Sequence, residues 1–170
     1  KGATLISVDP RFTRTSAAAN IYAPIRSGAD IPFLGGMINY ILENKLYHED
    51  YVRLYTNATF LVNKDFKMPG ELDGVFSGYD SKKRSYDKKA WAFQTDADGV
   101  VKKDEGMTDP MSVFQLLKKH YSRYTIDRVS EVSGTPKEKL EQIYKVYGST
   151  GRADRVATIT TPDPNWNGAE

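Results

Sequence analysis

Hydrophobic and polar positions near the start of the chain predict two short strands separated by a brief helix. Residues 3–8 form an apolar run typical of a buried strand. The run stops at Asp9-Pro10, because proline cannot donate a hydrogen bond to a neighbouring strand. Residues 13–19 fit a brief helix with a threonine or serine N-cap, and residues 21–25 are extended and predict an edge strand.

The clearest helix is predicted for residues 31–46, where apolar residues recur at three- and four-residue steps. Asp30 precedes this helix, and its carboxylate is open to two interpretations, a helix N-cap or a ligand contact. Gly35-Gly36 lies inside the apolar stripe and would allow a neighbouring element to approach very closely. A second helical piece is predicted for residues 48–55.

The last third of the chain is predicted to be helical, because threonine and proline recur where helices begin and glycine where they end. Residues 152–159 then predict the start of another strand, and residues 160–170 predict a disordered tail. The expected helix starts are Asp109-Pro110, Thr125, and Thr135 with a capping box, and Gly134 is the expected end of the second of these helices.

Between these two helical regions the sequence pattern changes from helical periodicity to frequent turn-forming pairs, such as Asp73-Gly74 and Asp98-Gly99. We interpret residues 59–107 as a loop and hairpin insertion. The alternating Trp91-Ala92-Phe93 is its expected hairpin strand. The insertion also carries a basic run, which we interpret as a solvated loop or a docking surface for another subunit: Lys82, Lys83, Arg84, Lys88 and Lys89.

Composition narrows the class of protein. The chain has 170 residues, and 24 Lys and Arg nearly balance 22 Asp and Glu, which argues against a nucleic-acid partner. No apolar run approaches the roughly 18 residues of a membrane-spanning helix, so we expect no direct membrane insertion. The absence of cysteine excludes disulfides, thiolate metal sites and cysteine-ligated iron–sulfur clusters within this chain. Because the chain lacks an initiator methionine, we expect it to be part of a longer protein.

Acidic and basic residues near the two predicted strands form the candidate binding site. Asp9 lies at the carboxyl end of a strand, where open α/β sheets bind ligands and where an acid can accept hydrogen bonds from ribose hydroxyls. Asp30 lies at the mouth of a helix, and Arg11 and Arg14 are near in sequence. These residues suggest a nucleotide cradle, although a strand that ends in Asp-Pro is also an ordinary turn. Neither common glycine-rich phosphate loop is present, and no catalytic or metal-binding constellation is apparent.

The opening segment ATLISVDPRFTRTSAAANIYAPIRSGADIPFLGGMINYIL resembles a known family. It is similar to the catalytic (large) subunit of molybdenum- or tungsten-dependent formate dehydrogenases, in the dimethyl sulfoxide reductase (molybdopterin oxidoreductase) family. The resemblance continues into YTNA, GVFSGYD, SRYT and SGTPKEKLEQIYKVY, and it covers about residues 2 to 159. The chain therefore resembles an internal fragment of such a subunit.

The resemblance implies an α/β, dinucleotide-binding-like three-layer domain with parallel strands, a loop/hairpin insertion and a helical C-terminal third. Residues 1–58 and 108–159 would form the α/β pterin-dinucleotide-binding segment, residues 59–107 the insertion and residues 160–170 the tail. The cofactor implied is bis-molybdopterin guanine dinucleotide with Mo or W. At its guanosine end, Asp9, Pro10 and Arg11 would line the pocket, Gly28 and Asp30 would close it with Asp30 facing the guanine, and Thr13 and Arg14 would make nearby contacts.

The resemblance also implies an enzymatic activity whose metal and cluster ligands lie outside this chain. The whole enzyme would oxidise formate to carbon dioxide and pass two electrons to a [4Fe-4S] cluster, but neither the metal ligands nor the cluster ligands have counterparts here. The implied partners are the remainder of the large subunit, together with an iron–sulfur electron-transfer subunit, and the implied location is periplasmic. Two alternatives remain open: a non-catalytic subunit-docking module that uses the basic run, and free-standing nucleotide binding.

Overall fold

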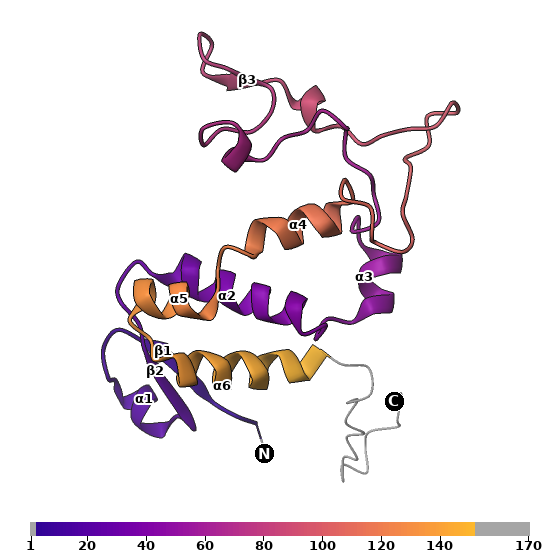
Figure 1. Cartoon of the computed structure of the whole chain (residues 1–170). Helices are drawn as coiled ribbons and strands as arrows, with labels where there is room; N and C mark the ends of the chain where they lie inside the picture. The colour runs from indigo at the N-terminus through magenta and orange to yellow at the C-terminus, as the bar shows by residue number, and fades with distance from the viewer. Residues whose placement is uncertain (1–2, 152–170) are drawn as a thin grey trace, which may run out of the picture.

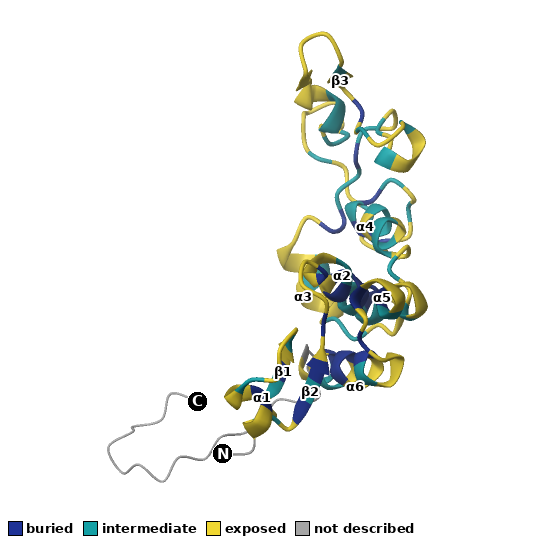
Figure 2. Ribbon diagram, turned by 90° about the vertical axis from the view of Figure 1, so that its left-hand side faces the viewer, coloured by how far each residue is buried: buried dark blue, intermediate teal, exposed yellow. Residues whose placement is uncertain are grey.

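A computed structural model of the chain describes residues 3–151, and it has a mixed α/β arrangement (Figure 1). Helices and a small parallel sheet form the body of the molecule, and the insertion extends away from that body (Figure 1). Buried residues concentrate in the body, whereas most of the insertion is exposed or half-buried (Figure 2). The hydrophobic core that supports the candidate site therefore lies in the body.

The predicted strand–helix–strand opening is confirmed. Strand β1 (Ile6–Asp9), helix α1 (Arg14–Ala18) and strand β2 (Ile21–Pro24) follow one another, and the two strands pair in parallel. Their register matches Ile6 with Ile21 and Asp9 with Pro24, so both strands end at the same edge. Within residues 3–151 this parallel sheet has two strands. Because two strands alone do not define a three-layer domain, the dinucleotide-binding-like three-layer architecture stays a prediction.

The two faces of β1 contact different elements, because successive side chains of a strand point to opposite faces. The Ser7 hydroxyl lies 3.0 Å from the Ser16 hydroxyl of α1, in a buried hydrogen bond. Ile6, one position earlier, packs against the main hydrophobic cluster. Helix α1 therefore covers one face of the strand, and the hydrophobic core covers the other.

Three helices build that core. Helix α2 (Asp30–Glu43), helix α5 (Ile126–Ser133) and helix α6 (Lys137–Gly148) pack together beside β2. Tyr144 is fully buried, and its hydroxyl donates a 2.6 Å hydrogen bond to the Phe33 carbonyl. Burial raises the pKa of the Tyr144 phenol well above its usual value, so the phenol stays protonated and remains a donor.

The close approach predicted at Gly35-Gly36 is confirmed. A Cβ at Gly36 would lie 2.7 Å from the Tyr144 hydroxyl and 2.8 Å from a Val129 methyl carbon. A Cβ at Gly35 would meet the Tyr124 ring at 2.9 Å. The missing side chains let α5 and α6 approach the backbone of α2, which compensates for the low helix propensity of glycine.

Helix α3 (Glu49–Tyr55) and helix α4 (Val113–Tyr121) flank the insertion. The two ends of the insertion meet, because Asp104 N donates to Thr59 O at 2.8 Å and Leu61 N donates to Lys102 O at 3.0 Å. Isolated bridges join its segments in the pairs Phe60–Lys103, Val62–Phe93 and Thr95–Val101, and a fourth, Leu61–Ser112, joins it to the residue before α4.

The hairpin of the insertion lies elsewhere than predicted. Strands β3 (Tyr79–Asp80) and β4 (Ser85–Tyr86) form it, whereas Trp91 ends a 3₁₀ turn, Lys88–Trp91. The Asp80 carboxylate accepts hydrogen bonds from two backbone N–H groups of the connecting turn, so local side-chain chemistry determines this reversal.

Three helix starts also differ from expectation. Asp30 is the first residue of α2 rather than its N-cap, and the cap residue, Ala29, makes no side-chain bond. Helix α4 begins at Val113 after a Ser112 cap, because the Asp109 carboxylate instead accepts from Met111 N at 2.7 Å and forms a turn. Helix α6 begins at Lys137 without a side-chain cap.

Other predictions are confirmed or stay untested. Thr125 caps α5, and Gly134 ends it in a left-handed conformation with φ 72°. The predicted strand at residues 152–159 and the predicted tail at residues 160–170 lie outside the described residues. The domain boundaries stay a prediction.

Candidate functional site

The carboxyl ends of β1 and β2 form the edge at which the sequence predicts a ligand. Because the strands are parallel, Asp9 and its partner Pro24 end at the same edge. The chain then passes through residues 25–29 and enters α2 at Asp30. Both predicted acids therefore belong to one edge of the fold.

Asp9 is half-buried and held by local hydrogen bonds. Its Oδ1 atom accepts from Arg11 N at 2.8 Å, and its backbone carbonyl accepts from the Tyr22 hydroxyl at 3.1 Å. The first of these bonds is an Asx turn, the local chemistry that ends the strand. The carboxylate is thus positioned by the backbone that follows it.

A turn that contains Gly28 leads from β2 into α2. Ala29 N donates to Arg26 O at 3.1 Å, and Gly28 has φ 83°, a left-handed conformation at the third position of the turn. No atom lies within 4 Å of a Cβ built on Gly28. The glycine is therefore required by the turn, and it leaves open space beside the start of α2.

The connection between α5 and α6 anchors this turn. Arg26 N donates to Ser133 O at 2.7 Å, and the Thr135 hydroxyl donates to Pro24 O at 2.6 Å. The Arg26 guanidinium donates to the carbonyls of Glu131 and Val132 near the end of α5. Sequence reasoning did not find these roles, since Thr135 was expected to cap α6 and Arg26 had no assigned partner.

We expect Arg26→Met to lower the free energy of unfolding by about 1 kcal/mol, because the substitution removes charge-assisted hydrogen bonds to carbonyls at a helix C-terminus. Urea denaturation monitored by circular dichroism measures the change. Arg14→Met, at an exposed position in α1, is the matched control and should change stability by less than about 0.5 kcal/mol. Equal stability of the two variants would contradict the anchoring role.

Asp30 is exposed and lines a cavity of about 270 Å³ with Val8, Leu34 and Tyr147 among its neighbours. Asp9 does not line this cavity. Because Val8 faces the cavity, alternation along β1 directs Asp9 toward the opposite face, the α1 side. The structure thus brings the two acids to one edge but not into one shared cavity.

The other predicted residues lie on the same edge. Pro10, Arg11 and Arg14 are exposed, and Arg14 begins α1. The Thr13 hydroxyl caps α1 by accepting from Ser16 N at 3.2 Å. Cofactor contact stays a prediction for each of these residues, and for Asp9, Gly28 and Asp30.

Residues 3–151 contain no group of three or more His, Asp or Glu side chains placed to hold a metal ion. None of the helices in this part of the chain is both long enough and apolar enough to cross a membrane.

Comparison with known proteins identifies the relatives of the chain, although no family model matches it. It is 51% identical over 159 residues to the alpha subunit of the formate dehydrogenase of Megalodesulfovibrio gigas, a match that covers 94% of this chain and 15% of the relative. It is 52% identical over 157 residues to the nitrate-inducible formate dehydrogenase major subunit of Escherichia coli K12, covering 92% of this chain and 15% of the relative. A more distant relative is a sulfite dehydrogenase subunit of Allochromatium vinosum, 27% identical over 175 residues and covering 92% of this chain and 18% of the relative.

All three relatives are subunits of dehydrogenases, and each match covers nearly the whole of this chain. The chain belongs to the family of formate dehydrogenase alpha, or major, subunits. It spans 15% of the length of these formate dehydrogenase relatives.

Proposed function

We propose that the chain forms part of the catalytic subunit of a formate dehydrogenase and seats the guanosine end of a bis-molybdopterin guanine dinucleotide. The observation that carries the proposal is the 51% identity to a formate dehydrogenase alpha subunit over 94% of this chain. The whole enzyme would oxidise formate to carbon dioxide, and the dinucleotide with its Mo or W would supply the two-electron chemistry when bound. This chain's own role is binding.

The chemistry of the edge fits a guanine nucleotide. The Asp30 carboxylate is exposed, has no ion-pair partner among the described residues, and can accept from the ring N–H and the amino group of guanine together. The Gly28 turn leaves space beside it. Asp9 lies at the carboxyl end of β1, on the face opposite Val8. Its carboxylate can accept hydrogen bonds from ribose hydroxyls.

A segment exchange tests the proposal in a complete enzyme. The matching 157-residue segment of the Escherichia coli nitrate-inducible major subunit is replaced by that of this chain. We expect the chimaera to retain formate-dependent dye reduction and a full content of guanine nucleotide, measured after acid hydrolysis. A stable chimaera that lacks both the nucleotide and the activity would contradict the proposal.

In this chimaera, Asp30→Asn should weaken retention of the guanine nucleotide by about 10- to 100-fold, the equivalent of losing a hydrogen-bonded pair with a charged acceptor. The asparagine would present an N–H donor opposite the N–H donors of guanine. Nucleotide content per subunit is the measurement. Glu43→Gln, an exposed charge change at the other end of α2, is the control and should leave the content unchanged. Full nucleotide content in Asp30→Asn would contradict the assigned contact.

The partners and location follow from the same proposal. The remainder of the large subunit would complete the pocket, and an iron–sulfur subunit would carry electrons away from the enzyme. The M. gigas relative is one subunit of its enzyme, which supports assembly with other chains. We propose a periplasmic location for the whole protein, which fractionation of cells that express it would test.

A further inference from the structure

The connection between α5 and α6 carries a residue that is fully buried and hydrogen-bonded through its backbone and its side chain. Thr135 has no exposed surface, its N–H donates to the Ser133 hydroxyl at 3.2 Å, and its carbonyl accepts from the Ser130 hydroxyl at 2.7 Å. Its own hydroxyl donates to Pro24 O at 2.6 Å. Because each of these groups has a defined partner, the bonds hold the side chain in one orientation.

The Pro24 carbonyl lies at a point in the fold that connects the two predicted acids. In the register of the sheet, Pro24 is the partner of Asp9, so it lies beside the end of β1. Along the chain, Pro24 is the last residue of β2, and the segment that leads to Asp30 begins directly after it. A hydrogen bond to this carbonyl therefore acts on the strand end beside one acid and on the segment that presents the other.

Bonds from the same connection continue along that segment. Arg26 N donates to Ser133 O at 2.7 Å. The Arg26 side chain packs on Gly134, where an added Cβ would lie 3.2 Å from Nε and 3.3 Å from Cγ, and Gly134 has φ 72°. The lack of a side chain at Gly134 therefore lets the connection lie against the turn that Ala29 N closes by donating to Arg26 O.

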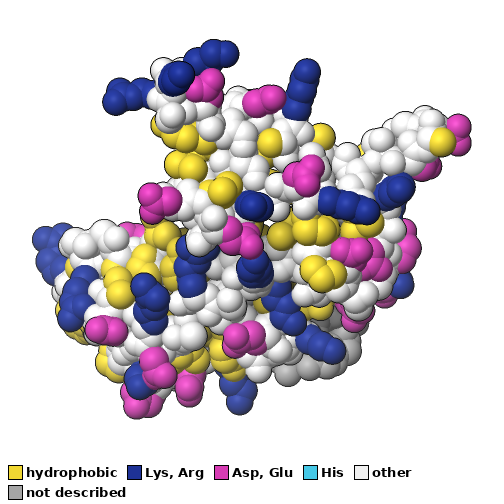
Figure 3. All heavy atoms as spheres, turned by 45° about the horizontal axis from the view of Figure 1, so that its top comes forward, with side chains coloured by type: hydrophobic (Ala, Val, Ile, Leu, Met, Phe, Trp, Pro, Cys, Tyr) yellow, Lys and Arg dark blue, Asp and Glu magenta, His cyan; other side chains and the backbone are white. Residues whose placement is uncertain are grey.

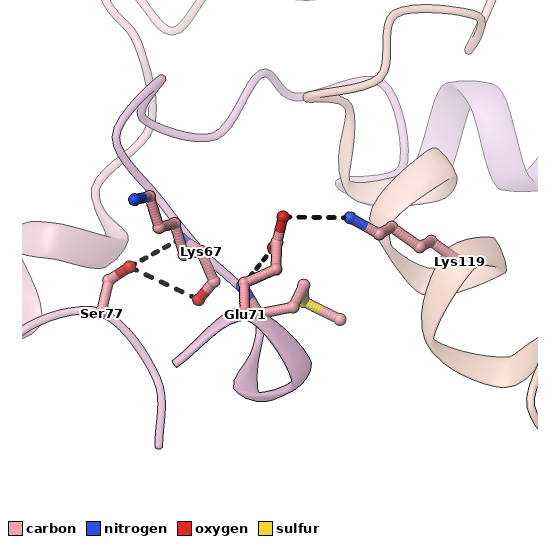
Figure 4. A network of polar contacts seen from close by, with 5 residues as sticks. Lys67, Glu71, Ser77 and Lys119 are labelled. Carbon is pink, nitrogen blue, oxygen red and sulfur yellow. Dashed lines mark hydrogen bonds and ion pairs between the residues drawn. The ribbon is translucent and has the colours of Figure 1, made fainter. Parts of the chain in front are cut away.

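Burial distinguishes this connection from the charged contacts at the surface. Lys and Arg side chains lie among Asp and Glu side chains over the face shown in Figure 3, so charge alone marks no site there. In the insertion, the Glu71 carboxylate accepts from Met68 N at 3.0 Å and forms a 3.5 Å ion pair with Lys119 (Figure 4). The Glu71 and Lys119 side chains are 48% and 61% exposed, so water competes for both partners. Loss of a buried bond, in contrast, leaves a polar group without its partner.

We propose that Thr135 is a positioning residue for the guanine nucleotide: its hydroxyl, acting through the Pro24 carbonyl, holds the strand end at Asp9 and the turn before Asp30 in the arrangement that binds the nucleotide. The inference rests on the proposed function and extends it to a residue 111 positions from Pro24 in the sequence. Groups that bind a ligand need support from hydrogen bonds behind them, because small displacements cost affinity. Since Thr135 is buried, it acts through its neighbours and not by contact with the nucleotide.

Variants of the Escherichia coli chimaera test the proposal through the rate at which the folded protein loses guanine nucleotide, measured after acid hydrolysis at intervals below the melting temperature. Thr135→Val keeps the shape of the side chain but removes the donor to Pro24 O. We expect nucleotide loss to become about five- to tenfold faster, the factor that corresponds to one hydrogen bond. Thr135→Ser keeps the hydroxyl and should restore the rate to within about twofold of the unaltered chimaera.

A milder variant covers the case in which Thr135→Val does not fold. Ser130→Ala removes the bond to Thr135 O at a half-buried position, and nucleotide loss should become about two- to fivefold faster. The effect is smaller because the Thr135 hydroxyl remains and only its support is weakened.

Two controls separate positioning from general destabilisation. Leu140→Ala removes packing from the core but no hydrogen bond of the connection, and Glu71→Gln alters the exposed contact of the insertion. Both should lose nucleotide within about twofold of the unaltered rate, whatever their melting temperatures. Equal loss in Thr135→Val and Thr135→Ser, or loss in Leu140→Ala as fast as in Thr135→Val, would overturn the proposal.

The positioning role and the proposed function fail in different ways. If Asp30→Asn weakens nucleotide retention and Thr135→Val does not, the nucleotide contact stands and the positioning role is wrong. The same holds for an unchanged rate in Ser130→Ala where the valine variant does not fold. If the unaltered chimaera holds no nucleotide, the proposed function is wrong and this inference fails with it.

Discussion

Leu140→Ala should lower the free energy of unfolding by about 2–5 kcal/mol, the range measured for leucine-to-alanine changes in well-packed cores. Leu140 has no exposed surface and packs in α6 beside Val129 of α5, Ile143 and the Tyr144 ring. Because each of these neighbours is itself buried and held by other contacts, the space left by the lost side chain cannot close fully. Chemical denaturation of the purified chain, followed by tryptophan fluorescence and circular dichroism, measures the effect.

A surface substitution provides the comparison. Leu54→Ala removes the same atoms from a leucine of α3 that is 61% exposed, and it should cost less than about 1 kcal/mol. If the two substitutions destabilised the chain equally, α6 would not hold the central position in the core that the structure gives it.

Gly36→Val should destabilise the chain by about 3 kcal/mol, at the upper end of the usual cost of overpacking. The first added carbon would already lie 2.7 Å from the Tyr144 hydroxyl and 2.8 Å from Val129, and both of those residues are fully buried. The new side chain would force α5 and α6 away from α2 and break the hydrogen bond from Tyr144 to Phe33. Valine has a better helix propensity than glycine, so the measured loss understates the steric cost.

Thermal melts of Gly36→Val and Ile31→Val test this prediction together. Ile31 lies on the same helix and is 74% exposed, so its replacement should change stability by less than about 0.5 kcal/mol. The Tyr144 phenol provides a second measurement, because separation of the helices would expose it to water and return its raised pKa toward the usual value. Unchanged stability in Gly36→Val would show that α2 and α6 do not approach as closely as described.

Local sequence signals predicted the elements whose ends are determined locally. The Asp9-Pro10 pair ends β1, Thr125 caps α5, and Gly134 ends that helix, as the residue types alone indicate. The Gly35-Gly36 pair was likewise recognised as a point of close approach, because few other reasons place adjacent glycines within an apolar stripe. In each case the residue type itself carries the signal.

Sequence reasoning was wrong where hydrogen bonds between residues far apart in the sequence determine the local structure. Thr135 has the spacing of a helix cap, yet its hydroxyl donates to Pro24, which is 111 residues away. Arg26 similarly bonds to carbonyls more than 100 residues distant. A local capping bond and a long-range bond draw on the same hydroxyl, and only the folded arrangement determines which one forms.

The sequence indicated where Asp9 and Asp30 lie in the fold but not how they are arranged, and their role in binding stays a prediction. Strand ends and a helix start were enough to bring Asp9 and Asp30 to one edge. The alternation of side chains along β1 could also have shown that Asp9 and Val8 face opposite sides, which argues against a shared cavity. Register and alternation, rather than motif spacing, therefore carry the information about how the two acids are arranged.

The closure of the insertion at its base has a consequence for how such subunits diversify. Thr59 and Leu61 pair with Asp104 and Lys102, so the chain leaves the body and returns to it at nearly the same place. Everything beyond that stem could lengthen, shorten or be exchanged during evolution with little disturbance to the helices beneath it. The stem thus determines where this segment leaves and rejoins the body, whatever the length of the chain beyond it.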